Sequence, residues 1–493
     1  MADTAALPAQ PIESIAPAAI FTPMARDAVS YGTASLLFLA INAVSAFLLP
    51  RIVSVDTYGA FKLFLLYGGY VGVLHFGSLD GALVRWAKEP DALVRREFSA
   101  VLVSAVATCT LAVSVALSVW MLRRSVTGLW SMAVALLVFA IAANATTAVQ
   151  FAMQAARRFH TLSALSILQP GIFLAGILIL KARGAITAKE LLAFYIGSAL
   201  LALAVYLLQI RSRVEFRWPS FAAAERLSAI HFRSGIFILL SNLGLNLVLG
   251  LDRIFLSTRF SLRDFAVYSF AASVFYSICL MIQAISKVVF PYVSRQTSSL
   301  EQRTSFVCAQ RAVLAVWAVG LTAYFPAEFL VRELLPVYVA AIPIFRIALL
   351  GLGAAAIVQI VHCNYFRAYA GERKMLAGTC VGLCSFAIAL WIAASFHSLQ
   401  AIAWAAVSAH TVWWAVNESL LWRDTDRTFT SSLRDFATMV AVAALFLYCS
   451  EQPTIIRAAL YLAASVLGIT FVLGPRTILT VVERYVFAGE ADS

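Results

Sequence analysis

Polar side chains interrupt an apolar stretch near the middle of the chain. Asn242, Asn246 and Arg253 fall within about 40° of one another if residues 235–256 form one helix. A charge inside an apolar span is costly, so Arg253 needs water, an anion or a polar neighbour. A guanidinium beside amides suits a hydrated groove that binds phosphate and sugar, because it donates charge-assisted hydrogen bonds to phosphate oxygens. The alternative is a contact between helices that the amides hold by hydrogen bonds.

A second cation lies in the apolar residues 58–79. Lys62 is one turn into this stretch, and a continuous helix would place Lys62, Gly69, Phe76 and Asp80 on one face. Lys62 either faces a hydrated groove and attracts an anion, or reaches the membrane interface with its long side chain. The sequence leaves both readings open.

Further polar residues occur in two other apolar stretches. Gln283 and Lys287 are one turn apart near the end of residues 266–290, where the lysine would meet a phosphate of either a ligand or the lipid surface. Asn42, in residues 29–50, is a lone amide that fits the groove or helix packing equally well. With Lys62, Asn242, Asn246 and Arg253, these residues are the predicted substrate-binding set.

His410 and Glu418, in residues 398–421, are candidates for proton coupling. Histidine titrates near neutral pH, and burial can raise the pKa of a glutamate toward the same range. The alternative is that each is a satisfied hydrogen-bonding group or an interfacial charge.

The sequence does not predict an enzyme. It contains no G-x-x-x-x-G-K-[ST] phosphate loop, no H-E-x-x-H zinc motif and no G-x-S-x-G nucleophile motif. Asp424 and Asp426 have the D-x-D spacing of metal-dependent glycosyltransferases, but they lie in a short basic connection between Arg423 and Arg427. We interpret them as a solvated charge cluster. The seven cysteines form no recognisable metal set, so no catalytic residue, metal or cofactor is predicted.

The elements that would position these residues are membrane spans. The 493 residues are 62% hydrophobic and 13% charged, whereas about a quarter of the residues are charged in a soluble domain. Apolar runs long enough to cross a bilayer as helix, roughly 20 residues, recur along the chain. We therefore predict an all-α polytopic membrane protein of about fourteen spans, at residues 29–50, 58–79, 100–122, 129–153, 162–180, 191–210, 235–256, 266–290, 307–325, 343–366, 375–394, 398–421, 435–449 and 456–473.

Basic residues predict the orientation. Alternate connections together hold 24 of the 37 lysines and arginines. The positive-inside rule places these connections, and both termini, in the cytoplasm. This bias explains the net charge of +12 without a nucleic-acid partner.

The longest basic connection runs from Arg211 to Arg233 and would join two six-helix bundles. A shift of 207 residues aligns Tyr58–Phe61 with Phe265–Tyr268, which suggests an internal repeat of the kind found in transporters. The expected domains are a cytoplasmic tail at residues 1–28, bundles at 29–210 and 235–421, a linker at 211–234, and two further helices with a tail at 422–493.

Four segments resemble oligosaccharide flippases of the multidrug/oligosaccharidyl-lipid/polysaccharide (MOP) superfamily. Leu48–Gly59 resembles the first hairpin of that family, except that Ser54 and Val55 replace its glycine. The other segments are Gly77–Arg85 at the end of the second span, Leu251–Leu256 followed by Ala266–Ser269, and Phe290–Arg295 at the end of the eighth span.

The resemblance implies two bundles around a cavity lined mainly by spans one, two, seven and eight. It also implies that the chain moves an undecaprenyl-pyrophosphate-linked oligosaccharide across a bacterial inner membrane by alternating access. The lipid-linked oligosaccharide and the bilayer are then its partners, and polysaccharide polymerase and chain-length machinery are further candidates.

Three alternatives belong to other classes. A multidrug/cation antiporter of the same superfamily would favour acidic residues in its cavity, whereas here deep cations outnumber deep acids. A polysaccharide polymerase or ligase would carry a large periplasmic loop, and none is predicted. A scaffold without transport would not need the cationic stripe.

Overall fold

The structure is a computed structural model of the chain. It describes residues 37–38, 40–42, 44–87, 90–123, 130–156, 158–216, 221–294, 299–369, 371–452 and 454–473. Every regular element in these ranges is a helix, which confirms the predicted fold class. The predicted tail at residues 1–28 lies outside the described ranges.

Within the described residues, each predicted span falls on a helix or on a run of short helices. A first apolar helix includes Ala40–Ile52. The remaining helices are α2 Val55–Gly68, η1 Val71–His75, α3 Ser78–Trp86, α4 Pro90–Arg123, α5 Trp130–Ala155, α6 Phe159–Ser166, α7 Leu168–Arg183, α8 Ala188–Ile210, α9 Phe221–Arg259, α10 Leu262–Ser294, α11 Ser299–Gly320, η3 Leu321–Ala323, α12 Tyr324–Leu334, η4 Pro336–Ala341, α13 Ile342–Ile357, the π-helical turn η5 Val358–His362, α14 Cys363–Ala368, α15 Glu372–Ala394, α16 Leu399–Thr425, α17 Phe429–Ser450 and α18 Ile455–Leu473.

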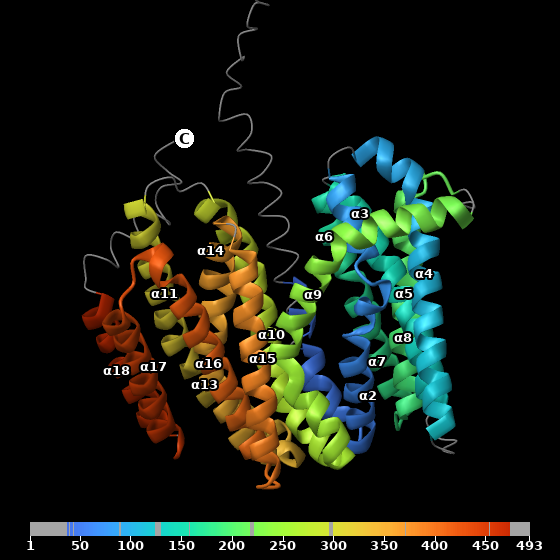
Figure 1. Cartoon of the computed structure of the whole chain (residues 1–493). Coiled ribbons are helices and arrows are strands. Elements are labelled where there is room, and N and C mark those ends of the chain that lie inside the picture. Colours follow the sequence, from blue (N-terminus) through green and yellow to red (C-terminus); the bar gives the residue numbers. More distant parts are fainter. Residues whose placement is uncertain are drawn as a thin grey trace, which may run out of the picture.

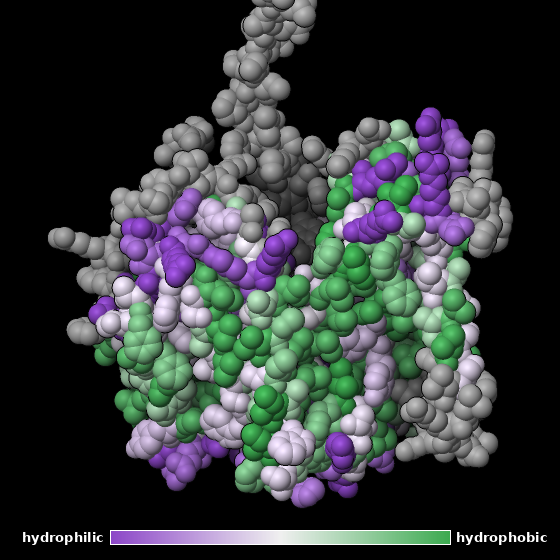
Figure 2. All heavy atoms as spheres, viewed as in Figure 1, coloured by the Kyte–Doolittle hydropathy of each residue, from purple (hydrophilic) through white to green (hydrophobic). Residues whose placement is uncertain are grey.

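On the face shown in Figure 2, an apolar belt lies between two polar ends. Ten helices of the described residues are long and apolar enough to cross a membrane, or eleven if a bent pair counts as one span. The helix α16 is not among them. It carries His410, Asn417 and Glu418, and all three side chains are buried in the protein rather than turned toward lipid.

Two groups of helices stand side by side, α2–α8 on one side and α10–α18 on the other (Figure 1). The long helix α9 belongs to both. Its first half contacts α3 and α4, where Ser228 and Ser104 share a hydrogen bond of 2.6 Å. Its second half contacts α15 and α16, where His410 lies against the Val248 carbonyl. Because α9 begins at Phe221, most of the predicted linker is helix.

The second span is broken, which corrects the prediction of one continuous helix. Phe76 and Gly77 both adopt left-handed backbone conformations, and the helix axis bends by 60° between Val55–His75 and Ser78–Trp86. The His75 ring stabilises the break, because its Nδ1 accepts a hydrogen bond of 3.1 Å from the Gly77 N–H. Phe76 and Asp80 therefore do not share a helical face with Lys62.

The helices α3 and α9 cross in backbone contact. A Cβ atom at Gly81 would overlap the His231 carbonyl, and one at Gly235 would overlap the Gly77 carbonyl. Nearby, the Glu97 carboxylate accepts from Arg85 at 3.0 Å and lies 3.4 Å from the buried His231 ring. Small residues allow such close approach in membranes. This crossing fixes the first half of α9 to the α2–α8 group.

The two groups also meet at the opposite end of the molecule, the lower end in Figure 1, where α2 packs against α10. A Cβ atom at Gly59 would lie 2.9 Å from the Leu262 carbonyl. The Tyr58 ring is 5.5 Å from the Tyr338 ring, which in turn is 5.0 Å from the Phe270 ring. At the upper end the surface is indented between the groups (Figure 2). We call this contact between α2 and α10 the seal, because it joins the two groups at the lower end.

Candidate functional site

Two cations from different helices lie close together just above this seal. The Lys62 Nζ on α2 is 5.3 Å from the centre of the Tyr58 ring, and the Arg253 guanidinium on α9 is 4.8 Å from the Tyr276 ring. Both cations are only partly buried, and they are close enough for their charges to repel. No carboxylate of the described residues forms an ion pair with either one. We call Lys62, Arg253 and their aromatic neighbours the cationic site.

Tyr67 near the end of α2 and Tyr70, just before η1, extend the cationic site to α9. The Tyr70 hydroxyl donates to the Asn246 carbonyl at 3.5 Å, and the Tyr67 and Ser257 hydroxyls are 3.0 Å apart. Sequence reasoning missed both tyrosines. Their spacing of three residues, following Lys62 in the same predicted span, was the available signal.

Asp252, the acid next to Arg253, already has hydrogen-bond partners for both of its carboxylate oxygens. Asp252 accepts a hydrogen bond of 2.6 Å from the Tyr268 hydroxyl and one of 2.8 Å from the Arg253 backbone N–H. It is buried and forms no ion pair with the Arg253 guanidinium. Asp252 therefore fixes the end of α9 and leaves the Arg253 side chain available to a ligand.

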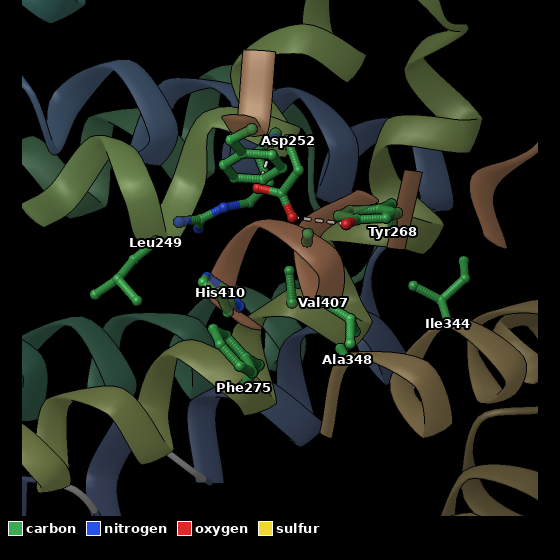
Figure 3. A pocket seen from close by; sticks show the side chains of 12 residues that line it. Leu249, Asp252, Tyr268, Phe275, Ile344, Ala348, Val407 and His410 are labelled. Atoms are coloured by element: carbon green, nitrogen blue, oxygen red, sulfur yellow. Dashed lines mark hydrogen bonds between the residues drawn. The ribbon is translucent and has the colours of Figure 1, made fainter. Parts of the chain in front are cut away.

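Behind Arg253 lies a small cavity that Asp252 and His410 also line (Figure 3). Its volume of about 20 Å³ is enough for a single water molecule. The His410 Nε2 lies 3.2 Å from the Val248 carbonyl, so this nitrogen carries the proton, and the ring stacks on Phe275. The other ring nitrogen, Nδ1, is buried with no partner among the described residues. A water in this cavity would satisfy it.

Solved structures share this arrangement of helices, although the chain matches no protein-family model and no curated protein sequence. The lipid II flippase MurJ, in an inward closed conformation, aligns with 92% of this chain and 99% of its own, with a TM-score of 0.63 and 12% identity. An outward-facing multidrug resistance transporter of the MATE family and the MOP superfamily aligns with 84% of this chain and 96% of its own, with a TM-score of 0.57 and 12% identity. A mutant of the Vibrio cholerae MATE transporter VcmN aligns with 81% and 98%, with a TM-score of 0.53 and 14% identity.

The chain has the MOP-superfamily fold. The alignment with MurJ covers 92% of the chain, so it extends well into the part beyond residue 300, where no sequence segment suggested the family. The fold that the resemblance implies is thus confirmed.

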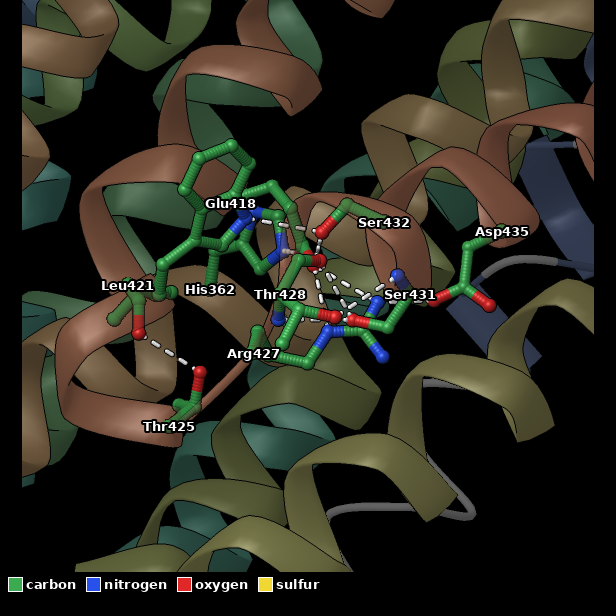
Figure 4. Close-up of polar contacts among 10 residues, drawn as sticks. His362, Glu418, Leu421, Thr425, Arg427, Thr428, Ser431, Ser432 and Asp435 are labelled. Carbon is green, nitrogen blue, oxygen red and sulfur yellow. Dashed lines mark hydrogen bonds and ion pairs between the residues drawn. The ribbon is translucent and has the colours of Figure 1, made fainter.

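Glu418 is on the same helix as His410, α16, but later in the chain. It lies in a buried ionic network (Figure 4). Its carboxylate contacts the His362 ring at 3.0 Å, the Arg427 guanidinium at 2.9 Å and the Ser432 hydroxyl at 2.8 Å. Arg427 also pairs with Asp435 on α17. Burial opposes the charge of Arg427, but the two carboxylates outweigh it and raise the pKa of Arg427. The network fastens α17 to α16 and to the π-helical turn.

We expect Arg427→Leu to destabilise the protein by about 3–5 kcal/mol, because it leaves two buried carboxylates without a cation. Glu418→Gln should cost less, since Arg427 keeps Asp435. The thermal midpoint of the purified protein in detergent measures both effects. Arg423→Leu, at an exposed arginine of the same connection, is the control. Equal midpoints for the two leucine variants would show that the network does not hold α17.

In the MOP fold, the other residues of the predicted substrate-binding set lie farther apart than Lys62 and Arg253 do. Asn242 is exposed on α9, and Gln283 is partly buried on α10. The Asn42 amide donates to the Phe38 carbonyl of its own helix at 2.8 Å. The backbone of Lys287 belongs to α10, but its side chain lies outside what the structure describes. Of the predicted set, Lys62 and Arg253 come together, and the Tyr70 hydroxyl reaches the backbone carbonyl of Asn246.

The D-x-D segment is exposed at the end of α16. Asp424 pairs with Lys374 at 2.6 Å, and Asp426 pairs with Arg303 at 2.7 Å. Each aspartate has a cation as its partner, which fits the interpretation as a solvated charge cluster.

Proposed function

We propose that the chain is a flippase that moves an undecaprenyl-pyrophosphate-linked oligosaccharide across a bacterial inner membrane. The observation that carries the proposal is the cationic site. Lys62 on α2 and Arg253 on α9 lie close enough to interact electrostatically, and no carboxylate of the described residues forms an ion pair with either one. Two cations held close together favour an anionic ligand, because a bound anion relieves their repulsion.

The chemistry of the site suits each part of this cargo. The guanidinium of Arg253 donates forked hydrogen bonds to phosphate, and Lys62 adds a second positive charge. The rings of Tyr67 and Tyr70 offer apolar faces and hydroxyls to sugars, and Asn246 offers an amide. The hydrocarbon tail would stay in the bilayer while the polar head crosses, since moving sugars and phosphate through lipid unaided is prohibitive.

The proposed cycle is alternating access. In the present state α2 and α10 seal one end, and the surface is indented between the groups at the other. The positive-inside rule predicts that the indented end is cytoplasmic, because it carries basic residues such as Arg85, Arg95 and Arg158. Cargo would enter there and leave after the groups separate along the α2–α10 seal.

His410 is the stronger of the two candidates for proton coupling. It lines a cavity of the size of a water molecule next to Asp252 and Arg253, so a proton there would act on the cationic site. Glu418 is instead held by a cation on α17 within a charge-balanced network. We therefore propose an ion gradient or the membrane potential as the energy source, with His410 as a coupling residue. The chain itself would carry out no covalent chemistry.

An antiporter for organic cations shares the MOP fold and is the second candidate. The acid that such a transporter would use is Asp252, which adjoins the cationic site. Its two oxygens already accept hydrogen bonds from Tyr268 and the Arg253 backbone, and the side chains nearest the gap are cations. The electrostatics thus favour the anionic cargo.

Loss of the protein distinguishes the two candidates. We expect that deleting the gene makes lipid-linked repeat units accumulate on the cytoplasmic leaflet and depletes surface polysaccharide, with the wild-type gene restoring both. Leaflet-specific labelling of the glycolipid measures the accumulation. Export of ethidium, an organic cation, is the parallel control. Unchanged glycolipid with impaired ethidium export would establish the antiporter instead.

A further inference from the structure

Two hydroxyl groups are buried at the seal without a hydrogen-bond partner. One belongs to Tyr338 on η4 and the other to Ser269 on α10, and these residues are 1% and 3% exposed. Neither hydroxyl oxygen forms a hydrogen bond with any of the described residues. Burial of such a group is unfavourable, because the hydrogen bonds to water that it loses are not replaced. The two hydroxyls therefore oppose closure of the seal.

Tyr338 belongs to the second helix group and contacts the first. Its ring centre is 5.0 Å from that of Phe270 on α10 and 5.5 Å from that of Tyr58 on α2. The Tyr338 N–H donates to the Leu335 carbonyl at 2.8 Å, which fixes the residue at the start of η4. The contact with Tyr58 joins the two groups, so separation of α2 from α10 would uncover one side of the Tyr338 ring and admit water to its hydroxyl.

Ser269 lies on the face of α10 that meets α2. Helical geometry places it within about 60° of Leu262 and Ala266 on α10. A Cβ atom at Gly59 of α2 would lie 2.9 Å from the Leu262 carbonyl and 3.1 Å from the Ala266 Cβ, so this face is covered while the seal is closed.

Other buried or half-buried hydroxyls show that a partner is usually within reach. Ser273 and Ser277, on the same helix as Ser269, each donate to the carbonyl four residues earlier, at 2.5 Å and 2.8 Å. Tyr461 on α18 is as deeply buried as Tyr338, and its hydroxyl donates to the Ala318 carbonyl at 2.8 Å. A buried hydroxyl without a partner is an exception that calls for a physical reason.

We propose that the two hydroxyls limit the stability of the closed seal and so allow it to open. The aromatic rings and the close approach at Gly59 hold α2 against α10. When the helices part, water restores the hydrogen bonds of Tyr338 and Ser269, and this gain offsets part of the lost packing. A seal of the same shape without the hydroxyls would stay closed longer. The inference rests on the proposed alternating-access cycle, in which cargo leaves through the seal.

The test is Tyr338→Phe, which removes the hydroxyl and keeps the ring. We expect the thermal midpoint of the purified full chain in detergent to rise. Deuterium exchange of the backbone amides in η4 and at the start of α10 should slow about fivefold, which corresponds to roughly 1 kcal/mol, the low end of the cost of an unpartnered buried group. Export of the lipid-linked oligosaccharide should fall by a similar factor. Damage to the fold would instead lower stability and export together.

Tyr461→Phe is the matched control, because it removes a buried hydroxyl that has a partner and lies outside the seal. It should lower the thermal midpoint and leave exchange in η4 at the wild-type rate. Ser269→Ala should act as Tyr338→Phe does, and the double variant should exceed either one.

Three outcomes would overturn the proposal. An unchanged or lower midpoint in Tyr338→Phe would show that the hydroxyl is satisfied in the closed state, and so would faster exchange in η4. Wild-type export by a stabilised variant would show that opening of the seal does not limit transport. The midpoint and the exchange do not involve the glycolipid. If the wild-type protein itself fails to export that cargo, the proposed function is wrong, and these two measurements still decide the inference about the seal.

Discussion

Replacing Arg253 by alanine should lower export of the lipid-linked oligosaccharide about ten- to a hundredfold, the range expected for a lost hydrogen bond to a charged group. The amount of protein in the membrane should stay normal, because the Arg253 guanidinium forms no ion pair with a described carboxylate and its removal leaves no buried charge unpaired. Arg253→Lys should restore only part of the activity, since lysine lacks the planar fork that matches phosphate. Leaflet-specific labelling of the glycolipid in a complemented deletion strain measures each variant.

The control for this prediction lies on the same helix. Arg259, the last residue of α9, is exposed at the sealed end, so Arg259→Ala should export at the wild-type rate. Lys62→Ala should impair export less than Arg253→Ala, because a point charge gives phosphate less geometric support than a guanidinium. Full activity in both Arg253→Ala and Lys62→Ala would remove the cationic site from the proposed mechanism.

The sequence predicted the positions of the helices well, because the bilayer imposes a length on each apolar run. Residues 191–210 were predicted as a span, and α8 occupies Ala188–Ile210. The prediction failed where tertiary contacts decide. As a sequence, Gly77 and Ser78 are compatible with a continuous helix. The second span breaks there because the α9 backbone approaches Gly77 closely and the His75 ring accepts a hydrogen bond from the Gly77 N–H.

The candidate site was predictable in part for a similar reason. Helical periodicity placed Asn246 and Arg253 on one face of α9, and the electrostatic interaction of Arg253 with Lys62 on α2 agrees with the placement of Arg253. Periodicity could not show which helix lies opposite, so Tyr67 and Tyr70 were missed. Arg427 appeared to be one of several basic residues in a short connection. In the structure Arg427 is buried, because its guanidinium forms ion pairs with both Glu418, earlier in the chain, and Asp435, later in the chain.

In the proposed alternating access, the first half of α9 must move with the α2–α8 group and its second half with the α10–α18 group. The glycine crossing of α3 and α9 is the joint on the α2–α8 side, and the Val248 region against α16 is the joint on the other side. A change of angle between the groups must therefore bend or tilt α9 between Gly235 and Val248. The cationic residue Arg253 lies beyond this interval, on the part of α9 that would move with the second group in the proposed cycle.

We expect a second large effect at the crossing of α3 and α9. Gly235→Ala should abolish accumulation of folded protein, because the new methyl group would overlap the Gly77 carbonyl and approach the Gly81 amide. These are backbone atoms of α3, which cannot rotate away as a flexible side chain would. The cost should therefore exceed the roughly 1–3 kcal/mol typical of overpacking. Detergent extraction followed by size-exclusion chromatography of a fluorescent fusion measures the folded fraction.

A matched glycine separates this clash from a general effect of substitution. Gly197, on α8, has open space where its Cβ would lie, so Gly197→Ala should accumulate at least as much folded protein as the wild type. Alanine is also favoured over glycine in a helix interior by about 1 kcal/mol. Gly81→Ala should fail as Gly235→Ala does, since its methyl group meets the His231 carbonyl on the same contact. A monodisperse, fully active Gly235→Ala protein would mean that α3 and α9 do not touch through their backbones, and that the two helix groups are joined elsewhere.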